Sequence, residues 1–504
     1  MLRLNLADAD RGISPRRILV RGSLCLTGQG DPQRCSILVN GDTIESVIPT
    51  GGDLPNNCAV IEAEDCAVIP GLVNAHTHGH GGLSKGSGDR WTLELLLNAG
   101  GWIGGNRTDD DRYLSTLLTA VEMLQKGCTA CFDLSLAAPL PTSDGVAAAA
   151  HAYLDAGMRA VVAPMMGDIH FYRAMPGLLD AATPGMRRDM ERAAGTAGAS
   201  ILPALAKIAS DWSFPSDRLQ LGIAPTIPLH STDEFLLGCH EIAREHGLAF
   251  QTHLAESNTQ AVAATIRYGH STTMHLANLG LVDAKFSGAH GVWLDASDMH
   301  CLGENNAAIA HNPGSNLRLG SGIADVVGLL ERGVEVGIGT DGGASADGQN
   351  MFEATRLACN LSRVKGRTSD QWLEAIDAHR LATSGSARIL GMQDQIGRIA
   401  PGYKADLVFL DLTHVNYVPL NNLIHQVVHV EDGTAVRHVM VGGRMVVKNR
   451  NVLTVDVESL RQKSAAAAER LRAANAETRA IAERLAPLVG RFCNGLACKC
   501  AVAN

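Results

Sequence analysis

The sequence is short of basic residues, of long apolar runs and of any segment that looks like a secretion signal. Lys and Arg number 43 against 52 Asp and Glu, which gives a net charge of −9. Nucleic acids and anionic membranes attract clustered positive charge, so the net negative charge of this chain does not favour either as a partner. No apolar run approaches the ~20 residues of a helical membrane span, which excludes that topology.

The N-terminal segment MLRLNLADADRGISPRR mixes charged and apolar residues and lacks the apolar core of a signal peptide. This favours a cytoplasmic protein. The 12 cysteines are scattered through apolar segments, so we expect small buried hydrophobes and not a disulfide framework. The tail CNGLACKC, with Cys493, Cys498 and Cys500, is denser. We expect a frayed end there, with metal binding as the alternative.

The patterns along the chain predict an α/β protein with two domains. Residues 1–66 contain short alternating strands and a polar turn in NGDTIESV, which is a hairpin signal. From 67 to 385, strand-like runs alternate with helical stretches, which predicts a parallel sheet closed into a TIM-like (β/α)8 barrel. Residues 386–454 return to a β pattern, so both chain ends are expected to build one small β-sandwich domain. Residues 455–504 are expected to form a long helix and the cysteine-containing tail.

Three histidines stand at alternate positions in VIPGLVNAHTHGHGG, at residues 76, 78 and 80. Alternate residues of a strand project from the same face, so His76 and His78 are expected to share one ion. Neutral imidazole is a common metal ligand, and two on one face supply half of a four-ligand shell. From these residues alone, a histidine-rich loop without ligands remains the alternative.

Further polar residues follow later predicted strands, where a barrel enzyme gathers its active site. THLAES places His253 at a strand end, with Glu256 three residues on. AHGVWL, AAIAHNPGSN and VEVGIGTDGG each place one polar residue at a later strand end, namely His290, His311 and Asp341. Five such groups on successive strand ends favour a metal site over coincidence.

The motifs PGLVNAHTH, THLAES, AHGVWL, HNPGSNLRLGSG and GTDGGASADGQNMFEATRLA follow one another along the chain. In their order and spacing the chain resembles the amidohydrolase superfamily, specifically the aminohydrolase and chlorohydrolase branch of cytosine- and adenosine-type deaminases and triazine hydrolases. RILVRG and GRIAPGYKADLVFLDL resemble the β domain of that family. The similarity runs over about residues 17–450 and is weaker between 79 and 220.

The resemblance implies one divalent ion, expected to be Zn²⁺ with Fe²⁺, Mn²⁺ or Co²⁺ as alternatives, and an open position for water. It implies that Asp341 accepts a proton from that water and that His290 stabilises the charge beside it. Glu256 would carry the proton to the leaving group as a general acid and base. The implied metal ligands are His76, His78, His253 and Asp341.

The chain departs from the family pattern in the segment QLGIAPTIPLHS. Binuclear members have a carboxylated lysine there, and its absence favours a single ion. Thr226 stands where deaminases usually have a substrate-contacting histidine, so common purine compounds are expected to be poor substrates. The loop tryptophans favour an apolar substrate group, although the loop residues could instead merely pack. The expected substrate contacts are His80, Trp91, Trp102, Thr226 and His311.

Together these features predict a mononuclear metal-dependent hydrolase. It would attack an sp² carbon of an azine-type small molecule and expel an amine, ammonia or chloride. Hydrolysis of an amide, aryl urea or carbamate at the same site is the alternative. A non-catalytic barrel scaffold is disfavoured because every implied ligand is present. We also expect a homodimer or higher homo-oligomer.

Overall fold

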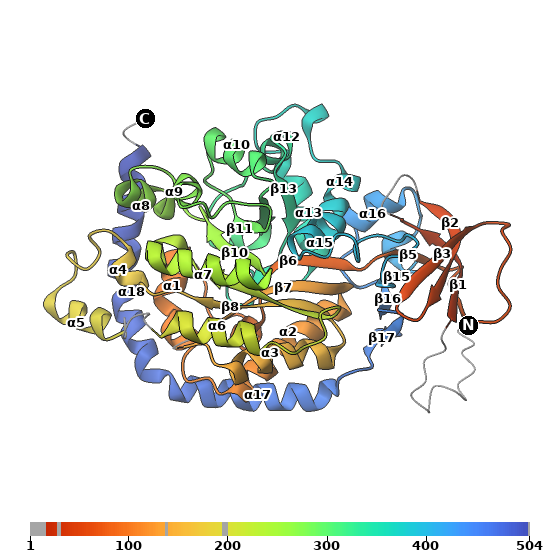
Figure 1. Ribbon diagram of the computed structural model, residues 1–504, viewed down its shortest axis with the longest axis horizontal. Helices are drawn as coiled ribbons and strands as arrows, with labels where there is room; N and C mark the ends of the chain where they lie inside the picture. The colour runs from red at the N-terminus through yellow and green to blue at the C-terminus, as the bar shows by residue number, and fades with distance from the viewer. Residues whose placement is uncertain (1–16, 28–31, 137–139, 194–199, 502–504) are drawn as a thin grey trace.

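Two nine-stranded sheets organise the protein in the computed structural model (Figure 1). The structure describes residues 17–27, 32–136, 140–193 and 200–501. Most of the N-terminal segment considered for a signal peptide, residues 1–16, therefore lies outside the described residues. Among the helices of the described residues, none is long and apolar enough to cross a membrane.

One of the two sheets is parallel and closes into a barrel. The pairing of β13 with β12 on one side and of β14 with β6 on the other joins the two edges of the sheet. β13 and β14 are separated only by Gly339 and Thr340, so they are two pieces of one eighth strand. This closure confirms the expected TIM-like barrel. The strands are, in chain order, β6 (Leu72–His78), β7 (Cys128–Leu136), β8 (Arg159–Met166), β9 (Leu219–Pro225), β10 (Ala249–Leu254), β11 (Phe286–His290), β12 (Ala308–His311), β13 (Glu335–Ile338) and β14 (Asp341–Gly342).

Helices cover the outside of the barrel, so its strands are buried along almost their whole length, as in other parallel sheets. Helix α2 shows how the sequence defines these helices. Its first turn is closed by a capping box between Thr108 and Asp111, and the chain turns at Gly127 with φ of 75°. The helical segments up to β14 are η2 (Gly79–Ser84), α1 (Leu93–Ile103), α2 (Asp109–Gln125), α3 (Ser143–Ala156), α4 (Phe171–Ala174), α5 (Pro184–Ala193), α6 (Ile201–Asp211), η3 (Pro228–His230), α7 (Asp233–His246), α8 (Asn258–Tyr268), α9 (Thr272–Asn278), α10 (Ala296–Glu304), α11 (Pro313–Arg318) and α12 (Val326–Glu331).

The second sheet is built from both chain ends, which confirms that part of the fold prediction. β15, from the C-terminal part, pairs with β5 from the N-terminal part, and the strands form one continuous mixed sheet. Its core includes the fully buried Val20, Ile37, Val68 and Phe409. The strands are β1 (Arg17–Cys25), β2 (Gln33–Asn40), β3 (Thr43–Pro49), β4 (Ala59–Glu62), β5 (Cys66–Pro70), β15 (Leu407–Asp411), β16 (Val436–Val441), β17 (Arg444–Lys448) and β18 (Asn451–Val452).

Two details of this domain bear on the sequence predictions. The polar turn of NGDTIESV does form a hairpin, because Asn40 of β2 pairs with Thr43 of β3. Cys25 of β1 and Cys35 of β2 are diagonal neighbours, since Cys35 pairs with Ser23 and Cys25 with Gln33, and they form a disulfide that the sequence pattern does not predict. Six of the other described cysteines are free and buried, as expected: Cys66, Cys128, Cys131, Cys239, Cys359 and Cys493.

The C-terminal helices run along the barrel, and α18 continues to Ala501 within the described residues. α18 packs beside α1 and α8 (Figure 1). Leu485, Val489 and Cys493 recur at helical spacing and are fully buried in a cluster with residues of α4 and η3. The expectation of a frayed end is therefore wrong, because this apolar stripe holds the helix against the barrel as far as its last turns. The helices after the barrel are α13 (Met351–Ser362), η4 (Ser369–Gln371), α14 (Ala375–Arg380), η5 (Leu381–Gly385), α15 (Ser386–Ile389), η6 (Val415–Tyr417), α16 (Leu423–His429), α17 (Val457–Ala474) and α18 (Ala476–Ala501).

A buried ion pair joins the barrel to the β domain, and breaking it should destabilise the protein. Arg159 of β8 donates to Asp406 from Nε at 2.8 Å, and both side chains are almost fully buried. Arg159→Met leaves the Asp406 carboxylate buried without its partner, which typically costs about 3–5 kcal/mol. We expect a loss of that size in urea unfolding. Arg461→Met, which breaks an exposed pair with Glu458, is the control and should leave the free energy of unfolding close to that of the wild type, because exposed ion pairs contribute little. An equal, small loss in both variants would contradict this prediction.

Candidate metal centre

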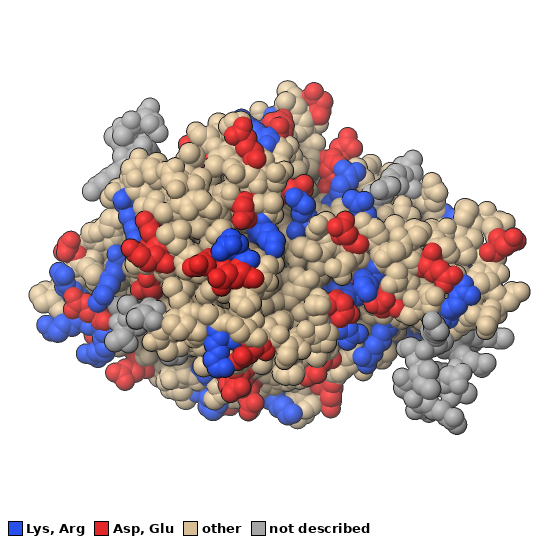
Figure 2. All heavy atoms as spheres, in the orientation of Figure 1, with Lys and Arg blue, Asp and Glu red and all other residues tan. Residues whose placement is uncertain are grey.

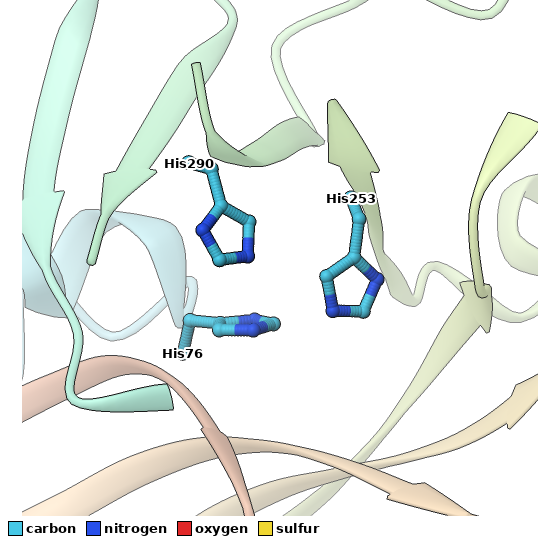
Figure 3. A group of neighbouring side chains, drawn as sticks. All are labelled: His76, His253 and His290. Atoms are coloured by element: carbon cyan, nitrogen blue, oxygen red, sulfur yellow. The ribbon is translucent and has the colours of Figure 1, made fainter. Parts of the chain in front are cut away.

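The polar residues predicted at strand ends come together at one end of the barrel. His76 and His78 lie at the end of β6, His253 near the end of β10 and His290 at the end of β11. Figure 3 shows His76, His253 and His290 pointing toward a common space from their separate strands. Asp341 begins β14, the piece of the eighth strand that pairs beside β6.

The distances between these side chains fit the size of a metal shell. His78 Nε2 lies 3.2 Å from His253 Nε2 and 3.1 Å from Asp341 Oδ1. His76 Nε2 lies 3.5 Å from Asp341 Oδ1. Ligand atoms of a tetrahedral zinc site, each about 2.0–2.2 Å from the ion, lie at comparable separations from one another. The four residues implied as ligands therefore lie around one common space, where His76 and His78 each approach Asp341 and His253 approaches His78.

Hydrogen bonds on the far side of each ring fix which nitrogen faces that point. His78 Nδ1 contacts the Leu134 carbonyl at 2.8 Å, and His253 Nδ1 contacts the Thr226 carbonyl at 2.5 Å. A carbonyl only accepts, so Nδ1 carries the proton and Nε2 carries the lone pair. Two lone pairs 3.2 Å apart repel each other unless a cation lies between them.

His76 repeats this arrangement with a side-chain acceptor. Its Nδ1 lies 2.7 Å from Gln251 Oε1, while its buried Nε2 has no hydrogen-bond partner among the described residues. The Gln251 amide in turn donates to the Ala75 carbonyl and the Ser287 hydroxyl, which fixes its oxygen toward His76. Outer partners that orient ligand imidazoles in this way are typical of metal sites. The donor set therefore fits a divalent ion.

His290 lies in contact range of the same centre. Its Nδ1 faces Asn316 Oδ1 at 2.8 Å, and its Nε2 lies 4.0 Å from Asp341 Oδ2 and 3.5 Å from Glu256 Oε2. Burial lowers the pKa of His290 to about 4, so the ring is neutral at pH 7. Nitrogens of His76, His253 and His290 also lie within 4.8 Å of one another. His290 thus has the position for its predicted role beside Asp341, and it is near enough to join the ligand set.

Glu256 is buried next to the candidate ligands, in the position that a general acid would need. Its side chain is 2% exposed, and burial raises its pKa well above the ordinary value. The negative charges of Asp341 and Glu94 add to the rise. A carboxylic acid that keeps its proton at neutral pH can give it to a departing group.

The backbone is left-handed at three positions around the site. Ala255, His290 and Asp341 have φ of 47°, 79° and 60°, values that residues other than glycine seldom adopt. Ala255 follows β10, His290 ends β11 and Asp341 begins β14. Such conformations cluster at functional sites, where the surrounding structure maintains them.

Asp341 is held by residues that the sequence analysis did not select. The Gln349 amide donates to the Asp341 carbonyl at 2.8 Å, and the Thr77 hydroxyl donates to it at 3.1 Å. Both Thr77 and Thr340 also donate to Gln349 Oε1. Gln349 therefore joins the first and last strands at the point where the barrel closes.

The glycines of HTHGHGG are required by a close approach of two backbones. A Cβ atom on Gly81 would lie 2.5 Å from the nitrogen of Gly343, and one on Gly343 would lie 2.5 Å from the Gly81 oxygen. The turn η2 thus packs directly on the loop after Asp341. Any side chain here would push the two ligand-bearing segments apart.

The residues expected to contact substrate lie in different surroundings. The His80 ring is 5.2 Å from the His78 ring, and its Nδ1 accepts a hydrogen bond from the Leu136 amide. Thr226 contributes its carbonyl to the orientation of His253. Trp91 and Trp102 contact each other edge to face at 6.2 Å, and Arg479 lies over Trp102.

His311 differs from the other expected substrate contacts in having a buried ring without hydrogen-bond partners among the described residues. It ends β12 and is buried, and both of its ring nitrogens lack a hydrogen-bond partner among the described residues. Burial lowers its pKa to about 3, so the ring is neutral. Buried polar atoms without partners nearly always meet a water or a ligand. The same is true of further atoms in the motif that follows, on Asn312, Ser315, Asn316 and Ser321.

Glu94 is a further candidate that the sequence analysis did not identify. It lies on α1, is 3% exposed and accepts a hydrogen bond from Ser257 at 2.7 Å. Its sequence context, an ordinary helix start, gives no signal. Gln251 could have been found, because it stands two residues before His253 and so shares its face of the strand.

Comparison with known proteins agrees with this geometry. The family model described as "Amidohydrolase family" matches residues 67–446. A 5-methylthioadenosine/S-adenosylhomocysteine deaminase of Desulforamulus reducens is 31% identical over 452 residues, which cover 88% of this chain and 96% of that protein. A 5'-deoxyadenosine deaminase of Methanopyrus kandleri is 28% identical over 461 residues, covering 90% of this chain and 99% of that protein.

Solved structures share the fold. An adenosine deaminase from Xanthomonas campestris with bound zinc has a TM-score of 0.79 at 24% identity and covers 90% of this chain and 98% of its own. An atrazine chlorohydrolase from Arthrobacter aurescens complexed with zinc has a TM-score of 0.77 at 23% identity, covering 90% of this chain and 100% of its own. With a family match over most of its length, this chain belongs to the amidohydrolase family of hydrolases that act on carbon–nitrogen bonds.

Proposed function

We propose that His76, His78, His253 and Asp341 hold one divalent metal ion, expected to be zinc, and that the protein hydrolyses an azine-type substrate. Water would add to an sp² ring carbon, and an amine, ammonia or chloride would leave. The observation that carries this proposal is the convergence of three Nε2 atoms and a carboxylate beside the buried Glu256, whose pKa burial raises.

The bound ion would supply an activated water, because it lowers the pKa of that water toward ~7. Asp341 Oδ2 faces His290, so this carboxylate oxygen is placed to take the proton from the water. His290 Nε2, with its Nδ1 anchored on Asn316, lies between Asp341 and Glu256 and stabilises charge there. Glu256 gives its proton to the leaving nitrogen and is reprotonated by the proton removed from the water.

The polar atoms around the site favour a polar substrate. His311 and the motif after it offer unpartnered donors and acceptors, and Glu94 places a buried carboxylate next to Glu256. The two tryptophans that suggested an apolar substrate contact each other instead, and Arg479 lies over Trp102. These observations favour an aminoazine with polar substituents, and the names of the relatives point to 5'-substituted adenosines as the first candidates. The unpartnered polar atoms and the names of the relatives argue against the expectation that Thr226 makes purine compounds poor substrates.

A substrate panel tests the proposal. We expect the zinc-loaded protein to release ammonia from at least one aminoazine among 5'-methylthioadenosine, S-adenosylhomocysteine, 5'-deoxyadenosine and aminotriazines. Chlorotriazines, anilides, aryl ureas and carbamates form the comparison set. Their turnover is measured as the release of chloride or of an amine. Turnover confined to the anilides, ureas or carbamates would overturn the azine assignment and establish the alternative of acyl carbon–nitrogen hydrolysis.

We further propose that the enzyme is cytoplasmic. Free thiols, among them the exposed Cys498 and the partly exposed Cys58 and Cys301, outnumber the cysteines of the single disulfide found in the described residues, and free thiols persist in reducing compartments. Lys and Arg are interspersed with Asp and Glu over the face shown in Figure 2, which suits a small-molecule enzyme without a nucleic-acid partner. The expected homo-oligomer stays a prediction, which size-exclusion chromatography with light scattering checks.

A further inference from the structure

A cavity of about 330 Å³ lies where the turn between α17 and α18 meets η2 and the end of α1. We call it the arginine cavity, because Arg107, Arg472 and Arg479 line it together with Lys85. None of its lining residues is acidic. Lys85 pairs with Glu122 and Arg479 with Glu483, both outside the lining. Arg107 and Arg472 have no carboxylate partner among the described residues.

Arg107 is the innermost of these cations and is held only by neutral groups. Its Nη atoms donate to the carbonyls of His80 and Ile103 and to the hydroxyls of Ser84 and Ser115. Its Nε is buried and has no acceptor among the described residues. Burial lowers the pKa of Arg107 to about 10, because the negative charge of Asp111 offsets the desolvation only in part. A buried cation without a counter-ion is costly, so an anion nearby would stabilise it.

The walls of the arginine cavity are fixed before any ligand arrives. The Asn475 amide at the α17–α18 turn donates to the Gly105 carbonyl at 3.0 Å, and the Asn106 amide donates to Asn475 Oδ1 at 3.0 Å. The Arg479 guanidinium lies 5.1 Å above the centre of the Trp102 ring. These contacts hold the helical turn and the end of α1 at a set distance. A preformed site loses little entropy when it binds.

We propose that the arginine cavity binds an oxyanion, either free phosphate or the phosphate group of a small ester. Guanidinium groups match the geometry of phosphate oxygens with pairs of parallel hydrogen bonds. Ser84 and Ser87 add hydroxyl groups to the lining. The volume lies at the lower end of the range for small-molecule sites.

This site is connected to the metal centre through one residue. Arg107 donates to the His80 carbonyl, and the His80 ring lies beside the ring of the predicted ligand His78. An oxyanion that contacts Arg107 therefore steadies η2, the turn that packs on the loop after Asp341. Arg107 is a positioning residue in this arrangement and does not itself touch the reacting atoms.

Calorimetric titration of the metal-loaded full chain tests the proposal at constant ionic strength. The probes are inorganic phosphate, ribose 5-phosphate and, as the uncharged control, ribose. We expect one equivalent of phosphate or of the ester to bind, and ribose not to bind. The double variant Arg472→Gln/Arg479→Gln should weaken binding at least about tenfold, because it removes two charge-assisted contacts. Arg491→Gln changes an exposed arginine of the same helix α18 outside the cavity and should leave binding unchanged.

Hydrogen exchange of residues 79–87 gives the second measurement, and ligand binding should slow it in the wild type but not in the double variant. Tighter binding of ribose 5-phosphate identifies an ester as the ligand, whereas equal or tighter binding of phosphate identifies the free ion. Absence of saturable binding would overturn the proposal. So would binding that the double variant leaves unchanged, as phosphate held at the metal centre would give. Neither measurement depends on turnover, so the result is independent of the proposed reaction.

Discussion

His253→Ala is expected to remove most of the bound metal and to lower activity by at least about 10³-fold. His253 supplies one of three inward Nε2 lone pairs and lies 3.2 Å from that of His78. Without the ion, the pKa of the reacting water returns from ~7 toward 15.7, so hydroxide becomes scarce at neutral pH. Elemental analysis of the purified variant and steady-state turnover measure the two effects.

The matched control is His300→Ala. His300 is an exposed histidine on α10 that pairs with Glu304 and not with a residue of the metal centre. Its removal should leave metal content and activity unchanged. Full metal content and wild-type turnover in His253→Ala would show that His253 is no ligand.

Glu256→Gln is expected to lower turnover by about 10²–10⁴-fold while the metal content stays that of the wild type. That range is the usual contribution of general acid–base catalysis. The glutamine keeps the shape of the side chain and can still donate toward His290, but it cannot give up a proton to a leaving nitrogen. The difference between the two variants therefore separates metal binding from proton transfer.

Glu241→Gln on α7, an exposed position, serves as the control for this substitution and should behave as the wild type. Single-turnover kinetics show whether the loss in Glu256→Gln lies in the chemical step. Wild-type turnover in Glu256→Gln would assign the proton transfer to another group, and loss of metal would make Glu256 a structural residue of the centre.

The strand-end residues could be predicted because their signal is local. His76 and His78 obey the two-residue period of a strand, and each later ligand follows an apolar run that could only be a buried strand. Gln251 belongs to the same local pattern. Glu94 and Gln349 do not, because their roles depend on which helix or loop the barrel brings next to the site.

In the C-terminal segment, too, the sequence predicts the local structure but not the tertiary contacts. Its composition predicts a helix, and the helix is there, but the contacts of Cys493 with residues of α4 and η3 arise from tertiary packing. The disulfide between Cys25 and Cys35 likewise depends on the register of β1 against β2. The substrate was the least predictable feature, because of the two tryptophans that suggested an apolar group, Trp102 contacts Arg479 at the arginine cavity and Trp91 packs on Trp102.

Anomalous diffraction from crystals of the zinc-loaded protein, recorded on both sides of the zinc absorption edge, tests the central claim most directly. The account predicts one strong peak per chain, about 2.0–2.2 Å from the Nε2 atoms of His76, His78 and His253 and from an oxygen of Asp341. A peak elsewhere, two peaks at the centre, or four ordered side chains with no peak between them would contradict it.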